Sequence, residues 1–160
     1  MNNPTSPFRR IVTGENVEGK SAVVENETLP LRLIDPIRER LEDSTWGADV
    51  WTVAHDPTSV FVRHVPDTWQ VEPPPAGAVF RVISFAPHST IDLHTTRTMD
   101  LGVVMSGEVW LTLEEDEVLL RPTDCVVVTG SQHGWENRSS EPCLMAAILM
   151  STSPSHNAQT

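Results

Sequence analysis

The chain has 160 residues, of which 39% are hydrophobic and 21% charged, as expected for one soluble globular domain rather than a disordered chain. Its formal net charge of −11 argues against nucleic acid and anionic membranes as partners, because both require clustered Lys and Arg. There is no apolar signal segment, no run long enough to span a membrane and no C-x-x-C spacing between Cys125 and Cys143. We therefore expect a cytoplasmic protein with two buried free thiols.

The N-terminal third of the chain predicts a few short elements between polar segments. Asp35 and Pro36 could begin a helix over 36–42, as N-cap and first helical residue, although a loop fits these residues almost as well. Alternating apolar residues and turn signals predict strands at 9–13, 20–26 and 48–55. Residues 1–8 and 151–160 are predicted to be disordered tails.

The segment "DTWQVEPPPAGA" at 67–78 is the clearest internal break, because three consecutive prolines cannot join the interior of a sheet. It predicts a connector between the N-terminal strands at 9–72 and a barrel core at 73–150. Short strands separated by Gly, Pro and Asp turns follow it, which predicts an all-β antiparallel sandwich or barrel. The predicted strands are 79–86, 90–95, 100–105, 107–114, 117–121, 125–129, 134–138 and 143–150.

Two histidines and one aspartate in this region could carry chemistry. Side chains alternate between the faces of a strand, so if His94 faces the barrel interior, Thr96 faces it too. Asp100 on the next strand and His133 on a later one would complete a set of two histidines and one carboxylate. Such a set can bind Zn(II), Fe(II), Mn(II) or Ni(II) with positions left open for a substrate.

The segments "HTTRTMDLGVVMSGE", "PTD" and "GSQHGWEN" resemble the two sequence motifs of the cupin superfamily. More narrowly, "FRRIVTG", "EPPPAGAVFRVISFAP" and "HGWENRSSEPC" resemble a small single-domain, cupin-2-like group with a reduced metal-binding motif. The resemblance covers most of the chain, with 27–70 as the poorest fit. It implies a double-stranded β-helix, that is a jelly-roll barrel, with an N-terminal strand extension.

Three positions depart from the superfamily pattern. Thr96 stands where the superfamily has a second histidine, Asp100 replaces a glutamate, and Thr123 replaces the glycine of a P-G-D turn. One divalent metal held by His94, Asp100 and His133 would have at most three protein ligands. Without a metal, the same residues could form a general acid/base set, because a carboxylate beside imidazoles tunes their pKa values. A purely structural role for all three is the remaining reading.

Other residues are placed by the same alternation. Substrate-binding residues are predicted to be Thr96, Val104, Trp110, Trp135 and Met145. Arg97 is predicted to be a surface charge, Asn137 to hold its own strand end, and the "EEDE" cluster at 114–117 to be a solvated hairpin tip.

The resemblance implies an enzyme of a secondary-metabolite pathway, namely an acid/base lyase or isomerase acting as a dehydratase, decarboxylase or cyclase. Its substrate would be a small apolar molecule with a carbonyl group, bound in the barrel, and it would need no cofactor or one divalent metal. A non-catalytic ligand-binding cupin and a metal-dependent oxygenase are the alternatives. A homodimer is expected, formed by packing of sheets or exchange of an N-terminal strand.

Overall fold

The computed structural model describes residues 8–33, 45–56, 59–63 and 70–152, and every regular element in these residues is a β-strand. The predicted helix at 36–42 and nearly all of both predicted tails lie outside these residues. The strands are β1 (Arg9–Glu15), β2 (Ser21–Thr28), β3 (Arg32–Leu33), β4 (Trp46–Asp56), β5 (Ser59–Arg63), β6 (Ala78–Phe85), β7 (Thr90–His94), β8 (Thr98–Ser106), β9 (Val109–Thr112), β10 (Glu117–Leu120), β11 (Cys125–Val128), β12 (His133–Glu136) and β13 (Cys143–Ser151). In the described part of the chain, no helix has the length and apolar character needed to cross a membrane.

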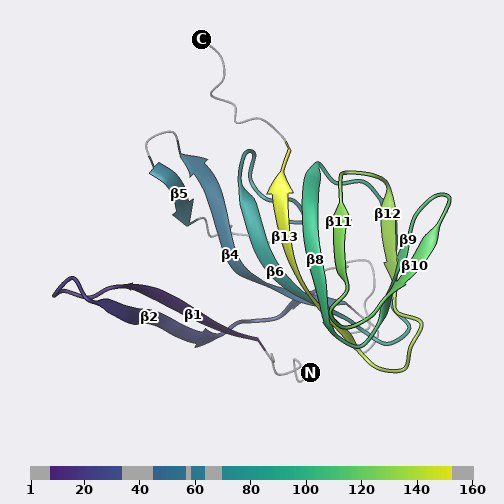
Figure 1. The fold of residues 1–160 in the computed structure, drawn as a ribbon, viewed down its shortest axis with the longest axis horizontal. Coiled ribbons are helices and arrows are strands. Elements are labelled where there is room, and N and C mark those ends of the chain that lie inside the picture. Colours follow the sequence, from purple (N-terminus) through teal and green to yellow (C-terminus); the bar gives the residue numbers. More distant parts are fainter. Residues whose placement is uncertain (1–7, 34–44, 57–58, 64–69, 153–160) are drawn as a thin grey trace, which may run out of the picture.

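Two sheets form the barrel, and a separate hairpin projects from it (Figure 1). The larger sheet has the order β11-β8-β13-β6-β4-β3, and β5 pairs with β4 at its edge; the smaller has the order β10-β9-β12-β7. All strand pairs are antiparallel. The hairpin consists of β1 and β2 alone. The prediction of an all-β jelly-roll fold is confirmed. The sequence reading missed the short strands β3 and β5.

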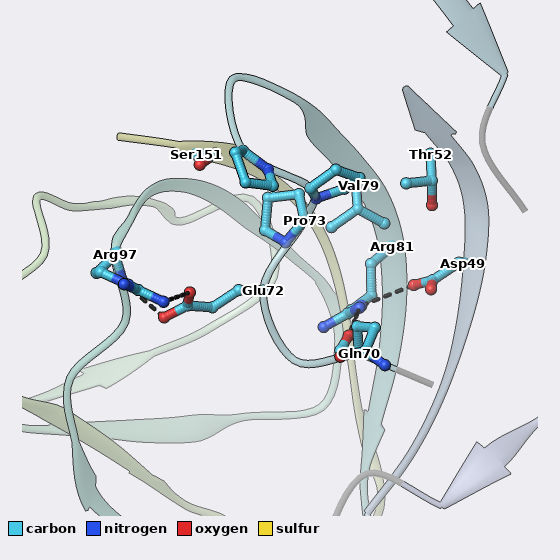
Figure 2. Close-up of a pocket in the computed structure, with 11 residues that line it drawn as sticks. Asp49, Thr52, Gln70, Glu72, Pro73, Val79, Arg81, Arg97 and Ser151 are labelled. Carbon is cyan, nitrogen blue, oxygen red and sulfur yellow. Dashed lines mark hydrogen bonds and ion pairs between the residues drawn. The ribbon is translucent and has the colours of Figure 1, made fainter. Parts of the chain in front are cut away.

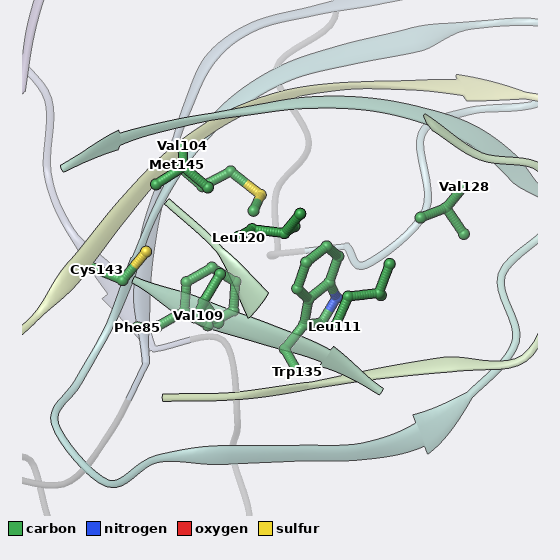
Figure 3. Packing of buried hydrophobic residues seen from close by; sticks show 9 residues of the cluster. All are labelled: Phe85, Val104, Val109, Leu111, Leu120, Val128, Trp135, Cys143 and Met145. Carbon is green, nitrogen blue, oxygen red and sulfur yellow. The ribbon is translucent and has the colours of Figure 1, made fainter. Parts of the chain in front are cut away.

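The main hydrophobic core lies between the two sheets of the barrel (Figure 3). The ring centroids of Phe85 and Trp135 lie 5.7 Å apart in a tilted arrangement. Full burial of a side chain of this kind contributes about 1.5–3 kcal/mol. The cluster consists of Phe85, Val104, Val109, Leu111, Leu120, Val128, Trp135, Cys143 and Met145.

The prediction of two buried thiols is correct for Cys143 and wrong for Cys125. Burial raises the pKa of the Cys143 thiol to about 11. Cys125 is exposed because it faces outward at the first position of β11, one residue before the partly buried Val126. Residues of a strand alternate between its two faces, so an apolar run such as "CVVV" does not bury every member.

Gly107 sits in a turn that excludes any other residue. Its φ is +70°, and a Cβ there would overlap the carbonyl oxygen of Pro142 and lie 2.8 Å from Cα of Cys143. The turn carries the chain from β8 to β9, and therefore from the larger sheet to the smaller one. The backbone conformation and close packing of this turn therefore explain why glycine stands at this position of the first motif.

Thr123, unlike Gly107, is not a glycine, yet its φ is +80°, a conformation that β-branched residues rarely adopt. The turn is fixed by hydrogen bonds from the Thr123 amide to the Val104 carbonyl oxygen and from the Arg121 amide to Asp124 Oδ2. We expect Thr123→Gly to raise the free energy of unfolding by about 1 kcal/mol, because glycine removes the strain. Urea denaturation measures this.

Thr90→Gly, in the regular strand β7, is the matched control. It should lower the free energy of unfolding by roughly 0.5–1 kcal/mol, since glycine weakens a strand. A Thr123→Gly protein no more stable than the parent would contradict the strain argument.

The outer surface of the larger sheet is apolar as well as its inner surface. Outward positions on β6, β8, β11 and β13 carry no charged residue, and we name this surface the outer apolar face. Val127, Leu101, Ile148 and Phe80 pair successively across the four strands, and their side chains are 37–58% exposed. The face consists of Ala78, Phe80, Val82, Ser84, Met99, Leu101, Val103, Met105, Cys125, Val127, Leu144, Ala146, Ile148 and Met150. Val82 is only 7% exposed, because it packs with Leu29 and Ala48 in a second hydrophobic cluster that Ala146 also contacts.

Candidate functional site

A cavity of about 190 Å³ lies inside the barrel, and we name it the barrel cavity. Its walls are mostly apolar, and its polar groups come from β6, β7, β8, β12 and the β7–β8 turn. This composition is typical of sites for small organic ligands. The lining residues are Val71, Arg81, Ile83, Phe85, Ile91, His94, Thr96, Asp100, Gly102, Val126, Val128, His133, Trp135, Met145, Ala147 and Leu149.

His94 and His133 face each other across a pair of antiparallel strands. Their Cα atoms are register partners between β7 and β12, and their ring centroids lie 4.5 Å apart. Nδ1 of His94 lies 2.8 Å from the Asp92 carbonyl oxygen, and Nδ1 of His133 lies 2.9 Å from that of Ser131. A carbonyl oxygen only accepts, so each Nδ1 carries the hydrogen. In the neutral ring, each Nε2 therefore keeps a lone pair for a proton or another ligand.

Asp100 is the third polar group of the cavity, and its environment is unusual for a carboxylate. Its Oδ1 atom is buried without a hydrogen-bond partner. Burial raises the pKa of Asp100, although the Thr98 hydroxyl and the charges of His133, Arg81 and His94 act in the opposite direction. Such a carboxyl group holds a proton to higher pH than an exposed one and can then donate a hydrogen bond.

His133 is 2% exposed, and burial lowers its pKa, despite the opposing effect of the Ser131 carbonyl. Below about pH 6.5 the unfolded chain binds a proton at this histidine while the folded chain stays neutral. The free energy of unfolding should therefore fall as the pH drops through this range. In His133→Gln this fall should be smaller, as urea titrations at several pH values would measure. Equal slopes for the two proteins would contradict the assigned direction.

The structure brings six of the eight predicted site residues to the barrel cavity: His94, Asp100, His133, Thr96, Trp135 and Met145. Val104 instead packs in the core beyond the cavity and is 1% exposed. Trp110 was predicted wrongly, because it faces away from the barrel between the buried Val109 and Leu111. There the Arg138 guanidinium stacks over its ring at 4.4 Å.

The predictions for Asn137 and Arg97 are confirmed. Asn137 donates hydrogen bonds from Nδ2 to the carbonyl oxygens of Phe85 and Glu141 and is fully buried, so it holds the end of its own strand. Arg97 is exposed and pairs with Glu72 in the connector.

Arg81 is the residue of the site that sequence reasoning missed. It lies on β6, is 4% exposed and lines the barrel cavity. Its guanidinium binds Asp49 on β4 and two carbonyl oxygens of the connector, those of Gln70 and Val71. The alternation of "VFRVISF" placed it on the same face as Val79, Ile83 and Phe85, which was the available signal.

The three predicted metal ligands do not form a closed group. Among the described residues, no three His, Cys, Asp or Glu side chains are arranged to hold a metal ion. Thr96 occupies the position of a further histidine, and its hydroxyl oxygen accepts a hydrogen bond from the Thr98 hydroxyl at 2.8 Å. The described residues at this site therefore do not fit a three-ligand metal site.

Comparisons with known proteins agree with this fold. A family model described as "Cupin domain" matches residues 81–150. The cupin-domain-containing oxidoreductase srdB of Neurospora crassa is 39% identical over 157 residues, which cover 92% of this chain and 75% of that protein. The phomopsin biosynthesis cluster protein C' of Diaporthe leptostromiformis is 38% identical over 66 residues, covering 41% of this chain and 35% of that protein.

Solved structures that are similar to this chain share less of its sequence. KdgF from Halomonas sp. has a TM-score of 0.49 and 15% identity, covering 76% of this chain and 87% of that chain. AerE from Microcystis aeruginosa has a TM-score of 0.44 and 28% identity, covering 50% and 40%. With the matched family model and a 39% identical relative aligned over most of both chains, this protein is a member of the cupin-domain family.

Proposed function

We propose that this protein is an enzyme of small-molecule biosynthesis that transfers protons to and from an apolar substrate in the barrel cavity. The observation that carries the proposal is the pair of facing histidines, each with Nδ1 bound to a carbonyl oxygen, beside a buried carboxyl group. The relatives named for phomopsin and oryzines biosynthesis clusters support the biosynthetic role.

The surroundings of His133 and Asp100 give each a different role in proton transfer. Nε2 of the buried His133 takes a proton from carbon next to a substrate carbonyl, because the lowered pKa of His133 keeps its lone pair available. In its protonated form, which burial favours by raising the pKa, Asp100 donates a hydrogen bond to the carbonyl oxygen as negative charge develops there. The Ser131 carbonyl orients the His133 ring. Loss of water, ring closure or return of the proton completes a lyase or isomerase reaction. In a decarboxylation, loss of CO₂ itself leaves the electron pair on this carbon, which then takes a proton.

Hydrogen–deuterium exchange tests proton transfer without knowledge of the substrate. The protein, treated with a chelator and kept under nitrogen, is incubated in D₂O with a small aryl ketone that has an α-hydrogen. We expect deuterium at the α-carbon, measured by NMR, well above the rate with the His133→Ala protein. Exchange no faster than in buffer would contradict the proposal.

A redox reaction is the second candidate, because two relatives, srdB and virC of Hypocrea virens, are named oxidoreductases. The virC protein is 27% identical over 152 residues, covering 91% of this chain and 76% of that protein. This reading predicts that turnover requires a bound metal, oxygen or an added electron carrier. Chelation and exclusion of oxygen therefore separate the two candidates.

We also propose that the protein acts as a homodimer joined through the outer apolar face. Strands buried on both faces have nearly continuous apolar sequences, and β13, "CLMAAILMS", has that pattern. A second copy presents the same uncharged row, so a twofold contact is self-complementary. Two copies that each carry a net charge of −11 repel least where the contact holds no charge.

A further inference from the structure

Arg81 lines both the barrel cavity and a second cavity, which lies against the same face of the larger sheet. The second cavity, of about 290 Å³, lies between β4, β6 and the proline connector (Figure 2). Apart from the histidines, Arg81 is the one cationic residue among the described residues that line the barrel cavity. How its charge is balanced therefore decides whether that cavity attracts anions.

The guanidinium of Arg81 is held by protein groups on three sides. Nε donates to Asp49 Oδ1 at 2.8 Å, Nη1 to the Val71 carbonyl at 3.0 Å, and Nη2 to the Gln70 carbonyl at 2.8 Å. The Arg81 side chain is 5% exposed and that of Asp49 is 20% exposed, so solvent screens the pair little. Figure 2 shows Arg81 between Asp49 and Gln70.

Asp100, the other charged residue of the barrel cavity, contributes no positive charge in either protonation state. A ligand carboxylate in the cavity would lose its hydration without gaining an unpaired cation, and an unpaired buried charge is costly. An uncharged ligand carries no such penalty. The apolar walls formed by Phe85, Trp135 and Met145 favour it.

We propose that Asp49 sets the charge selectivity of the barrel cavity: by neutralising Arg81, it makes the cavity accept uncharged ligands and exclude carboxylates. This inference rests on the proposed function in treating the barrel cavity as the substrate site. It narrows the reaction, because a decarboxylase must bind a carboxylate, whereas dehydration, ring closure and isomerisation can act on uncharged molecules. Asp49 lies outside the residues that match the family model.

The test compares two ligands of nearly equal shape, trans-cinnamamide and trans-cinnamate, by ligand-observed NMR titration. At about pH 8 imidazoles are neutral and cinnamic acid is ionised. We expect the wild-type protein to bind the amide at least about tenfold more tightly than the carboxylate. In Asp49→Asn, which keeps an acceptor for Arg81 Nε but removes the negative charge, we expect the preference to shrink about tenfold or to reverse.

Glu72→Gln is the matched control, because it removes the same charge from the Glu72–Arg97 pair, which lines the second cavity and not the barrel cavity. It should leave the wild-type preference unchanged. Asp49→Asn is repeated in the Asp100→Asn background, where Asp100 cannot replace Asp49 as the counter-ion, and the preference should shrink there too.

Four results would contradict the charge selectivity. The wild type could bind both ligands equally, or it could bind neither. The preference for the amide could change as much in Glu72→Gln as in Asp49→Asn, or it could stay unchanged in Asp49→Asn both with and without Asp100→Asn. Binding is measured without turnover, so the two proposals can fail separately. If the protein prefers the amide but fails the deuterium-exchange test, the proposed function is wrong and the charge selectivity is still supported.

Discussion

Replacing His133 by alanine is expected to lower kcat by about a thousandfold while the barrel stays folded. General acid/base catalysis by one side chain contributes typically ~10²–10⁴-fold, and His133 is the more deeply buried of the two facing histidines. Its side chain lines a cavity, so its loss enlarges a space that already exists. Turnover and circular dichroism, measured on the same preparation, give the two results.

His88→Ala is the matched control, since His88 is exposed in the turn before β7 and does not line the barrel cavity. Its activity should equal that of the parent. If His133→Ala retained more than about a tenth of the parental kcat, His133 would not be the base. His94→Ala would then be the variant to compare, because His94 has the same Nδ1 contact with a backbone carbonyl.

Replacing Leu101 by glutamate is expected to convert the proposed dimer to a monomer. Leu101 lies in the middle of the row Val127, Leu101, Ile148 and Phe80, so a twofold contact through this row would bring two new carboxylates into one apolar interface. Burying like charges without partners costs several kcal/mol, which raises the dissociation constant by at least about a hundredfold. Analytical ultracentrifugation over a range of concentrations measures the change.

The control is Val118→Glu on β10, which introduces the same charge at a residue that is 45% exposed in the smaller sheet. Its dissociation constant should match that of the parent. A wild-type protein that sediments as a monomer at all concentrations, or a Leu101→Glu protein that still dimerises, would contradict the proposed interface.

The sequence by itself determined where the barrel strands lie along the chain and which chemical groups could form the site. Every barrel strand from β6 to β13 lies within two residues of its prediction, because Gly, Pro and Asp turns mark strand ends locally. His94, Thr96 and Asp100 reached the same cavity because strand alternation is a local rule. The sequence likewise singled out Gly107 and Thr123 as motif positions. Both have a positive φ, which glycine adopts easily and threonine rarely does.

Only the tertiary structure decided which face of each strand is inside and what surrounds each charge. Trp110 was assigned to the wrong face because "VWLT" is apolar at three of its four positions and so gives no alternation to read. The Asp49–Arg81 pair joins residues 32 positions apart, and no local pattern predicts such a contact. The raised pKa of Asp100 and the lowered pKa of His133 also depend on burial by distant strands, which exists only after the sheets have packed.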